Sequence, residues 1–223
     1  MTKRLLSSTF ALVTLCSTLA IGQQRGTAPQ APPASPPATP GQPAPAGQRG
    51  GGGGGGRGRG GVQVMTLTST AWPDGGVIPV KYSQAGEEVS PALTWSSAPE
   101  GTVSFTLIVH DLDMAVGNAG DDLLHWMLWD IPADATGLRE GIARGSQLPD
   151  GTRQISATGP SYRGPGAPAS GPAHHYVFEL FALDTKIEVP AVGASPPLTR
   201  AAVVAAMAGH IRGKATYVGL FKR

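Results

Sequence analysis

Acidic, imidazole and phenol side chains gather in this sequence where several expected strands begin or end. Two aspartates close one alternating segment, a histidine opens the next, and two adjacent histidines and a tyrosine open a third. Strand ends that meet at one rim of a sheet, joined by loops, form the pockets in which such groups can hold a ligand. The residues concerned are Asp111, Asp113, His125, His174, His175 and Tyr176.

Asp111 and Asp113 are the first candidates. Residues two apart in an extended chain point to the same side, so we expect both carboxylates on one face. Two like charges that close raise the pKa of one carboxyl unless a cation or donor intervenes, and histidinium is the nearest cation on offer. The alternative is that both aspartates only cap loop amides, the commoner role of an aspartate after a strand.

The histidines also allow more than one interpretation. His125 lies between Leu124 and Trp126, and a lone histidine in such apolar company is more often a core residue than a ligand. His174 and His175 are adjacent, so on a strand they face opposite sides. Only one of these two can therefore serve a pocket.

A metal site and a nucleophilic enzyme are both weakly supported. Two aspartates and two histidines would suit zinc or iron, but the sequence contains no HExxH, HxH or CxxC spacing. There is no GxSxG motif, and Ser156 and Ser161 stand in no recognisable catalytic setting. We therefore expect no enzyme, no bound metal and no cofactor, and keep a metal-dependent enzyme as a third hypothesis.

The elements that must position these side chains are mostly strands. Residues 102–110 alternate between two faces, and residues 125–131 are apolar on both, as in a buried central strand. Residues 62–68 predict an edge strand with Val62, Val64 and Leu67 as its apolar positions. Residues 90–95 predict a bend that enters a short strand, and further strands are predicted at residues 174–183 and 215–221.

The remaining pattern predicts long loops and one helix. Loops are expected at residues 111–124, 132–154 and 159–173. The alanine-rich range 200–212 predicts a helix with Thr199 as its N-cap and Gly213 at its end. Many strands with a single late helix indicate an all-β sandwich with a small helical addition.

Composition divides the chain into three parts. Residues 1–22, with Lys3 and Arg4 before an apolar run and small residues before Gln23, predict a signal peptide. Alternatives are an uncleaved membrane anchor, or a lipid on Cys16, for which Leu15 is a bulky neighbour. We expect an exported protein, periplasmic or extracellular, with no stable membrane insertion after cleavage. Residues 62–223 are long enough for one hydrophobic core.

Residues 23–61 are rich in proline and alanine, then in glycine and arginine, and predict a disordered linker. Arg57 and Arg59 resemble an RNA-binding segment, but a flexible tether is the favoured interpretation. The full chain has a net charge of +2, whereas the part after Gly61 has eleven basic and fifteen acidic residues, a net charge of −4. We therefore expect no nucleic-acid partner.

Four segments, in the same order, resemble motifs of the phosphatidylethanolamine-binding protein family, which includes the Raf kinase inhibitor proteins and their bacterial relatives. Residues 111–115 (DLDMA) resemble its DPDAP segment, and His125 stands where the family has a histidine on its central strand. Residues 164–176 are similar to its GxPPxGxxHRY segment, and residues 90–95 to its SPxLxW segment. Leu112 and Ala115 replace the two prolines, and His175 replaces the usual arginine.

The resemblance implies two antiparallel sheets with small helices, and a pocket for phosphate, phosphorylated head groups or small carboxylates. It selects His174 rather than His175 as the inward residue. The implied function is a non-catalytic binding protein for a small anionic ligand or phospholipid head group. The alternative is a protein-interaction or inhibitor module with a protein partner. The implied pocket residues are Asp111, Asp113, His125, His174 and Tyr176, with Gly166 and Pro168 in its loop wall.

Overall fold

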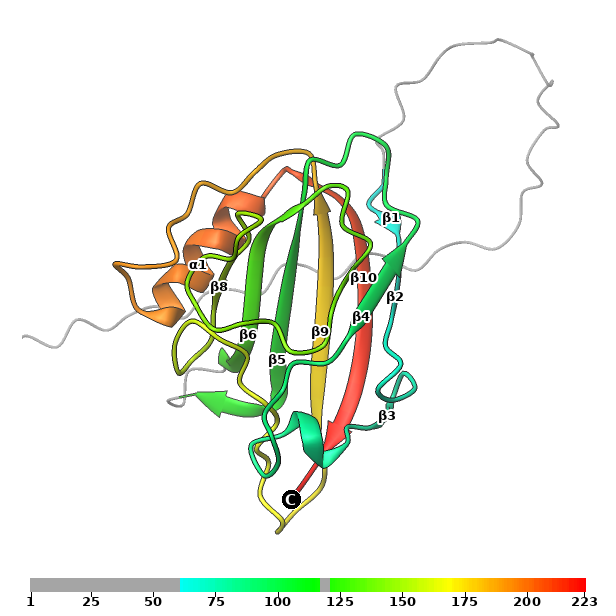
Figure 1. Ribbon diagram of the computed structural model, residues 1–223, viewed down its shortest axis with the longest axis vertical. Helices are drawn as coiled ribbons and strands as arrows, with labels where there is room; N and C mark the ends of the chain where they lie inside the picture. The colour runs from blue at the N-terminus through cyan, green and yellow to red at the C-terminus, as the bar shows by residue number, and fades with distance from the viewer. Residues whose placement is uncertain (1–60, 117–120) are drawn as a thin grey trace, which may run out of the picture. The chain divides into compact units, whose positions relative to one another are not determined.

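A computed structural model describes residues 61–116 and 121–223. The predicted signal peptide, Cys16 and nearly all of the predicted linker lie outside these residues. Two sheets and one α-helix make up the described part, as expected for a mostly β fold (Figure 1). Within these residues, no helix is long and apolar enough to cross a membrane.

The larger sheet has seven strands, in the order β1-β10-β9-β5-β6-β8, with β3 also paired to β10. Its long strands are β5 (Ser104–Val116), β6 (Asp121–Pro132), β9 (His174–Leu183) and β10 (Ile211–Phe221). Its short strands are β1 (Gln63–Val64), β3 (Gly76–Val77) and β8 (Arg153–Ile155). The long strands pair antiparallel, but β1 and β3 run parallel to β10, so this sheet is mixed rather than fully antiparallel.

The smaller sheet and the helix pack against the two faces of the larger sheet (Figure 1). The smaller sheet consists of β2 (Thr66–Thr68), β4 (Leu93–Ser96) and β7 (Gly137–Leu138), in the order β2-β4-β7. The helix α1 (Pro196–Met207) lies on the other face, and a 3-10 turn, η1, covers Val80–Tyr82. The larger sheet is therefore apolar on both sides.

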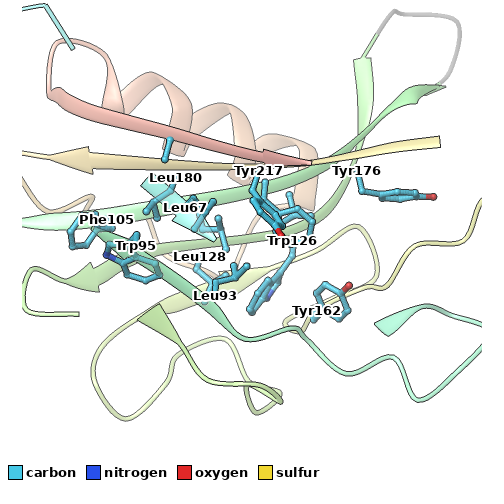
Figure 2. Close-up of a cluster of buried hydrophobic side chains, with 14 of the residues drawn as sticks. Leu67, Leu93, Trp95, Phe105, Trp126, Leu128, Tyr162, Tyr176, Leu180 and Tyr217 are labelled. Carbon is cyan, nitrogen blue, oxygen red and sulfur yellow. The ribbon is translucent and has the colours of Figure 1, made fainter. Parts of the chain in front are cut away.

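The two cores follow the predicted alternation. Phe105 and Leu107 of β5 join the core between the sheets, whereas Ile108 joins the core beneath α1. In β6, Trp126 faces the first core and Met127 the second. Figure 2 shows the first core, with Tyr176 at one end and its hydroxyl directed away from the cluster. Both sides of β6 are buried, as its apolar sequence predicted.

The expected edge strand at residues 62–68 is two strands in different sheets. β1 pairs with β10 and β2 pairs with β4, and the chain passes from one sheet to the other at Met65. Met65 is buried and its amide donates to the Lys214 carbonyl at 2.8 Å, whereas Val64 is 85% exposed. The predicted alternation is wrong here because the sheet change resets which side is inward.

Two predicted loops contain strand structure. Residues 111–124 are not a simple loop, because β5 and β6 extend as a paired hairpin in which Ala115 lies opposite Asp122 and Val116 opposite Asp121. Backbone pairing satisfies amides and carbonyls without burying side chains, so hydropathy gave no signal for it. The range 132–154 contains β7 and the beginning of β8, whereas no strand occurs in 159–173, as expected.

The helix begins and ends earlier than predicted. Ser195, not Thr199, is the N-cap, and Pro196 occupies the first turn, where a missing amide costs no hydrogen bond. The helix ends at Met207, and Gly209 turns the chain with a φ of +83°. Ile211 then begins β10, so Gly213 lies inside a strand rather than at the helix end.

Candidate functional site

Three strand ends and one loop meet at one end of the larger sheet, the lower end in Figure 1. They enclose a cavity of about 160 Å³. The loop is the long segment 159–173, which connects β8 to β9. Six of the seven predicted pocket residues line this cavity, namely Asp111, His125, Gly166, Pro168, His174 and Tyr176.

Asp111 and His174 form a hydrogen-bonded pair across neighbouring strands. Nδ1 of His174 lies 2.8 Å from Oδ2 of Asp111, and the side-chain carboxylate is nearly fully buried. Oδ1 of the same carboxylate accepts the backbone amide of Asp113 at 3.0 Å. A carboxylate bound in this way fixes the imidazole ring and leaves its Nε2 available to a ligand.

The structure does not bring Asp113 into the cavity. Its Oδ2 accepts the backbone amide of His175 at 2.6 Å and lies 2.8 Å from the ring Nδ1 of the same residue. The hydrogen bond from the His175 backbone amide, and next the one to the His175 ring, lower the pKa of Asp113. The expectation that both carboxylates lie on one side of the strand is wrong. Asp111 pairs with Leu123, and the next paired residue of β5 is Ala115, opposite Asp122. The residues between Asp111 and Ala115 therefore form a bulge, which resets the direction of their side chains.

His125 lies at a β-bulge in β6. Val109 pairs with Trp126 and the next residue pairs with Leu124, which leaves His125 without an opposite residue. The bulge resets the alternation, so Leu124 packs beneath α1 while Trp126 packs between the sheets. Bulges commonly re-aim a side chain beside a binding site, and here the histidine reaches the cavity.

The ring of His125 is held on two sides. Its Nδ1 lies 3.0 Å from the backbone carbonyl of Arg163, and the ring meets Tyr176 edge-on at 5.0 Å between centroids. Burial lowers the pKa of His125, outweighing the opposing influence of the Arg163 carbonyl and the Asp111 charge. His125 is therefore buried like a core residue, which was one of the two interpretations of the sequence, and it also lines the cavity.

Tyr176 anchors the loop that closes the cavity. Its hydroxyl oxygen accepts the backbone amides of Gly166 and Ala167 at 3.2 and 3.1 Å. Burial is the main cause that raises the pKa of Tyr176 to about 12, so the phenol stays protonated at neutral pH. A Cβ at Gly166 would lie 2.5 Å from Nε2 of Gln84, so a side chain there would require the end of Gln84 to move.

Five further residues line the cavity and were not predicted from the sequence, namely Gln84, Met114, Leu123, Arg163 and Ala167. Arg163 and Gln84 are the two with polar side chains. Arg163 precedes the loop segment that carries the family resemblance, so a basic residue at that place was a signal that could have been used. Gln84 gave no local signal. It is brought to the cavity by hydrogen bonds from its backbone amide to the Pro165 carbonyl and from its side chain to the Gly164 carbonyl.

Within residues 61–116 and 121–223, no three histidine, cysteine, aspartate or glutamate side chains are arranged to hold a metal ion. The cavity instead combines a hydrogen-bonded carboxylate, two imidazoles, a phenol and a guanidinium. Imidazole and guanidinium nitrogens suit the oxygen atoms of a small anion.

Comparison with known proteins identifies the class to which this fold and site belong. Residues 68–222 match the family model described as phosphatidylethanolamine-binding protein. A crystal structure of the Chlamydia trachomatis homologue CT736 superimposes with a TM-score of 0.60 at 30% identity, covering 72% of this chain and 99% of that one. The chain belongs to the phosphatidylethanolamine-binding protein family, whose members bind anionic ligands.

Within that family it belongs to the branch of the UPF0098 proteins and Escherichia coli YbcL. The YbcL crystal structure gives a TM-score of 0.60 at 29% identity and covers 71% of this chain and 98% of its own. A UPF0098 protein of Methanothermobacter thermautotrophicus is 38% identical over 161 residues, 71% of this chain and 99% of the relative. A Mycobacterium tuberculosis relative named "Putative lipoprotein LppC" is 34% identical over 160 residues, 71% of this chain and 72% of its own.

Proposed function

We propose that this protein is a non-catalytic binding protein for a small anionic ligand, either phosphate or a phosphorylated head group. The observation that carries the proposal is the Asp111–His174 pair at the wall of a small cavity that also contains His125 and Arg163. The carboxylate of Asp111 holds the His174 ring in place, and Arg163 adds a permanent positive charge. The ring nitrogen and the guanidinium together suit an anion at this end of the sheet.

The size of the cavity supports a small ligand. Pockets for drug-sized molecules measure about 300–1,000 Å³, whereas this cavity measures about 160 Å³. The Gly166 and Ala167 amides are held by the Tyr176 hydroxyl, so the loop wall is fixed before a ligand enters. A tetrahedral oxyanion suits this volume, with any larger substituent extending toward solvent.

Titration calorimetry with phosphate and with phosphoethanolamine tests the proposal. We expect saturable binding that His174→Ala abolishes, because the variant removes a hydrogen-bonding ring nitrogen from the cavity wall. His175→Ala is the matched control, since that adjacent side chain is exposed and pairs with Asp113 outside the cavity. Unchanged affinity in the folded His174→Ala protein would contradict the proposal.

A protein-interaction role is a second candidate, favoured by an exposed apolar stripe next to the cavity. Leu112, Met114 and Val116 lie at alternate positions of β5 and are 55%, 44% and 42% exposed. Neighbouring apolar side chains that stay exposed are typical of contact surfaces. Replacement of Leu112 and Val116 by serine, with Met114 kept because it lines the cavity, would abolish capture of one specific partner in a pull-down while leaving phosphate affinity unchanged. If no partner is recovered by the native stripe, this role is not supported.

Export is proposed on the apolar run after Lys3 and Arg4, and a relative's name that describes a lipoprotein supports it. We expect cleavage after Gly22, which intact-mass measurement of protein from expressing cells would detect as a chain starting at Gln23. A lipid on Cys16 would instead give a heavier product that Cys16→Ser removes. A full-length chain retained in the cytoplasm would contradict both outcomes.

A further inference from the structure

His125 differs from the other histidines of the chain in its electrostatic surroundings. All five histidines lie in the described residues, and four of them have a carboxylate oxygen within 4.0 Å of a ring nitrogen. His125 has no such partner within that distance and is only 2% exposed. A buried imidazole without a paired carboxylate favours the neutral form, because burial penalises the charged one.

The structure also fixes which nitrogen of His125 carries the proton. Nδ1 lies 3.0 Å from the Arg163 carbonyl oxygen, and a carbonyl can only accept a hydrogen bond. The proton therefore resides on Nδ1, which leaves Nε2 as an acceptor with a free lone pair. Nε2 is buried and has no hydrogen-bond partner in the structure. It is the one ring nitrogen of His125 to which the protein offers no hydrogen bond.

We propose that the cavity selects an oxyanion that itself carries a proton, such as hydrogen phosphate, and discriminates against oxyanions without one. The protonated oxygen donates its hydrogen bond to Nε2 of His125, while Arg163 offsets the negative charge. This inference rests on the proposed function, and it narrows the ligand class of the same site. Arg163 thus has two roles. Its backbone carbonyl keeps the proton of His125 on Nδ1, and its guanidinium attracts the anion.

Sulfate and phosphodiesters are the informative comparisons. Sulfate has nearly the same size and the same charge as the hydrogen phosphate dianion, but it carries no proton at neutral pH. Its oxygen lone pairs would face the lone pair of Nε2, and a buried polar group would stay unsatisfied. Sites that are built to bond a ligand hydrogen reject analogues that lack it. A phosphodiester, the form found in intact phospholipids, also lacks the proton, so the two sources of a phosphate group are distinguished.

The experiment is titration calorimetry of the full chain with sodium phosphate, sodium sulfate and dimethyl phosphate at about pH 7.5 and matched ionic strength. We expect phosphate to bind about tenfold or more tightly than either of the other two, from the cost of an unsatisfied buried acceptor. Equal or tighter binding of sulfate or dimethyl phosphate would overturn this inference and leave the proposed function intact. If none of the three anions binds, both are overturned.

His125→Gln supplies a second, independent readout. The glutamine amide offers both a donor and an acceptor, so the ratio of sulfate to phosphate dissociation constants falls from about ten toward one. His175→Gln makes the same chemical change outside the cavity and keeps the native ratio. A folded His125→Gln protein with an unchanged ratio would overturn the inference. If that variant does not fold, the preference of the native chain among the three anions still decides.

Discussion

Nδ1 of His174 lies 2.8 Å from Oδ2 of Asp111, which joins the beginning of β9 to β5 at the wall of the cavity. The carboxylate is almost completely buried, and its other oxygen accepts a backbone amide. Each of its oxygens thus has a partner within the protein. The negative charge of Asp111 is consequently directed at the imidazole rather than at the ligand.

Replacing Asp111 by asparagine tests that relationship. The amide keeps the shape of the side chain but replaces the charge-assisted hydrogen bond that orients His174 by a weaker one, so phosphate affinity is expected to fall about tenfold or more. Titration calorimetry at neutral pH measures the change. Asp113→Asn is the matched control, because Asp113 pairs with His175 and does not line the cavity. An equal loss in the two variants would show that both carboxylates serve the site.

Gly166→Ala tests the fit of the loop wall. The added methyl group would displace the side chain of Gln84 and break its hydrogen bond to the Gly164 carbonyl. We expect weaker phosphate binding with a loss of unfolding free energy of only about 1 kcal/mol, since the end of Gln84 can move.

A double variant shows whether Gly166→Ala acts through the clash between the new methyl group and Gln84 or in another way. In Gly166→Ala combined with Gln84→Ala, the methyl group has space, so the affinity should equal that of Gln84→Ala alone. Neighbouring sites that share a contact are expected to be non-additive in this way. Strictly additive losses in calorimetry would contradict the crowding mechanism.

Gln154 is a buried polar hub of the fold. Its Oε1 accepts the indole N–H of Trp126 at 2.9 Å, and its Nε2 donates to the carbonyls of Ala143 and Gly145. Gln154→Ala leaves a buried indole donor unsatisfied and should lower the free energy of unfolding by about 3 kcal/mol, as urea denaturation would measure. Gln63→Ala, which removes an exposed hydrogen bond to the Ser97 carbonyl, should change it by less than about 0.5 kcal/mol. Similar losses in the two variants would contradict this ranking.

A row of alternating charges crosses the helix-covered side of the larger sheet. Asp122 bonds to both Arg200 and His110, and Nε2 of His110 lies 3.2 Å from Glu179. Lys214 closes the row with Nζ 2.5 Å from the same glutamate. Burial by itself lowers the pKa of His110, but the adjacent carboxylates of Glu179 and Asp122 outweigh it and raise that pKa above 6.5.

This row predicts a specific loss of stability in acid. The nearby ring of His110, with further help from Lys214, lowers the pKa of Glu179 to about 2 from an ordinary 4.5. Because the folded-state pKa is the lower one, ionised Glu179 stabilises the fold above pH 4.5, and this contribution disappears as the pH falls toward 2. Its size is about 1–3 kcal/mol.

Chemical denaturation of the native chain and of Glu179→Gln across this pH range measures the effect. The difference in unfolding free energy between the two proteins should shrink as the pH falls from 4.5 toward 2, because the variant has no carboxylate to protonate. Other acids titrate in both proteins and cancel in the comparison. A difference that stays constant with pH would contradict the assigned role of Glu179.

The sequence by itself determined the strand class and most of the candidate site. β9 coincides with the predicted range 174–183, because alternation along one strand depends only on neighbouring residues. The opposite orientations of His174 and His175 follow from the same local geometry, and the family resemblance selected the inward one. These features need no knowledge of what lies across the sheet.

Only the tertiary structure decided the features that depend on pairing between strands. The bulges at His125 and after Asp111 arise because one strand has more residues than its partner between two consecutive pairs. The sequence of one strand alone does not contain this information. The first bulge turns a core histidine into a cavity residue, and the second removes Asp113 from the cavity. Arg163 and Gln84 reach the site across long sequence separations, through backbone contacts made only in the folded chain. Local sequence fixes which side a residue faces within a strand, but pairing decides where that alternation is reset.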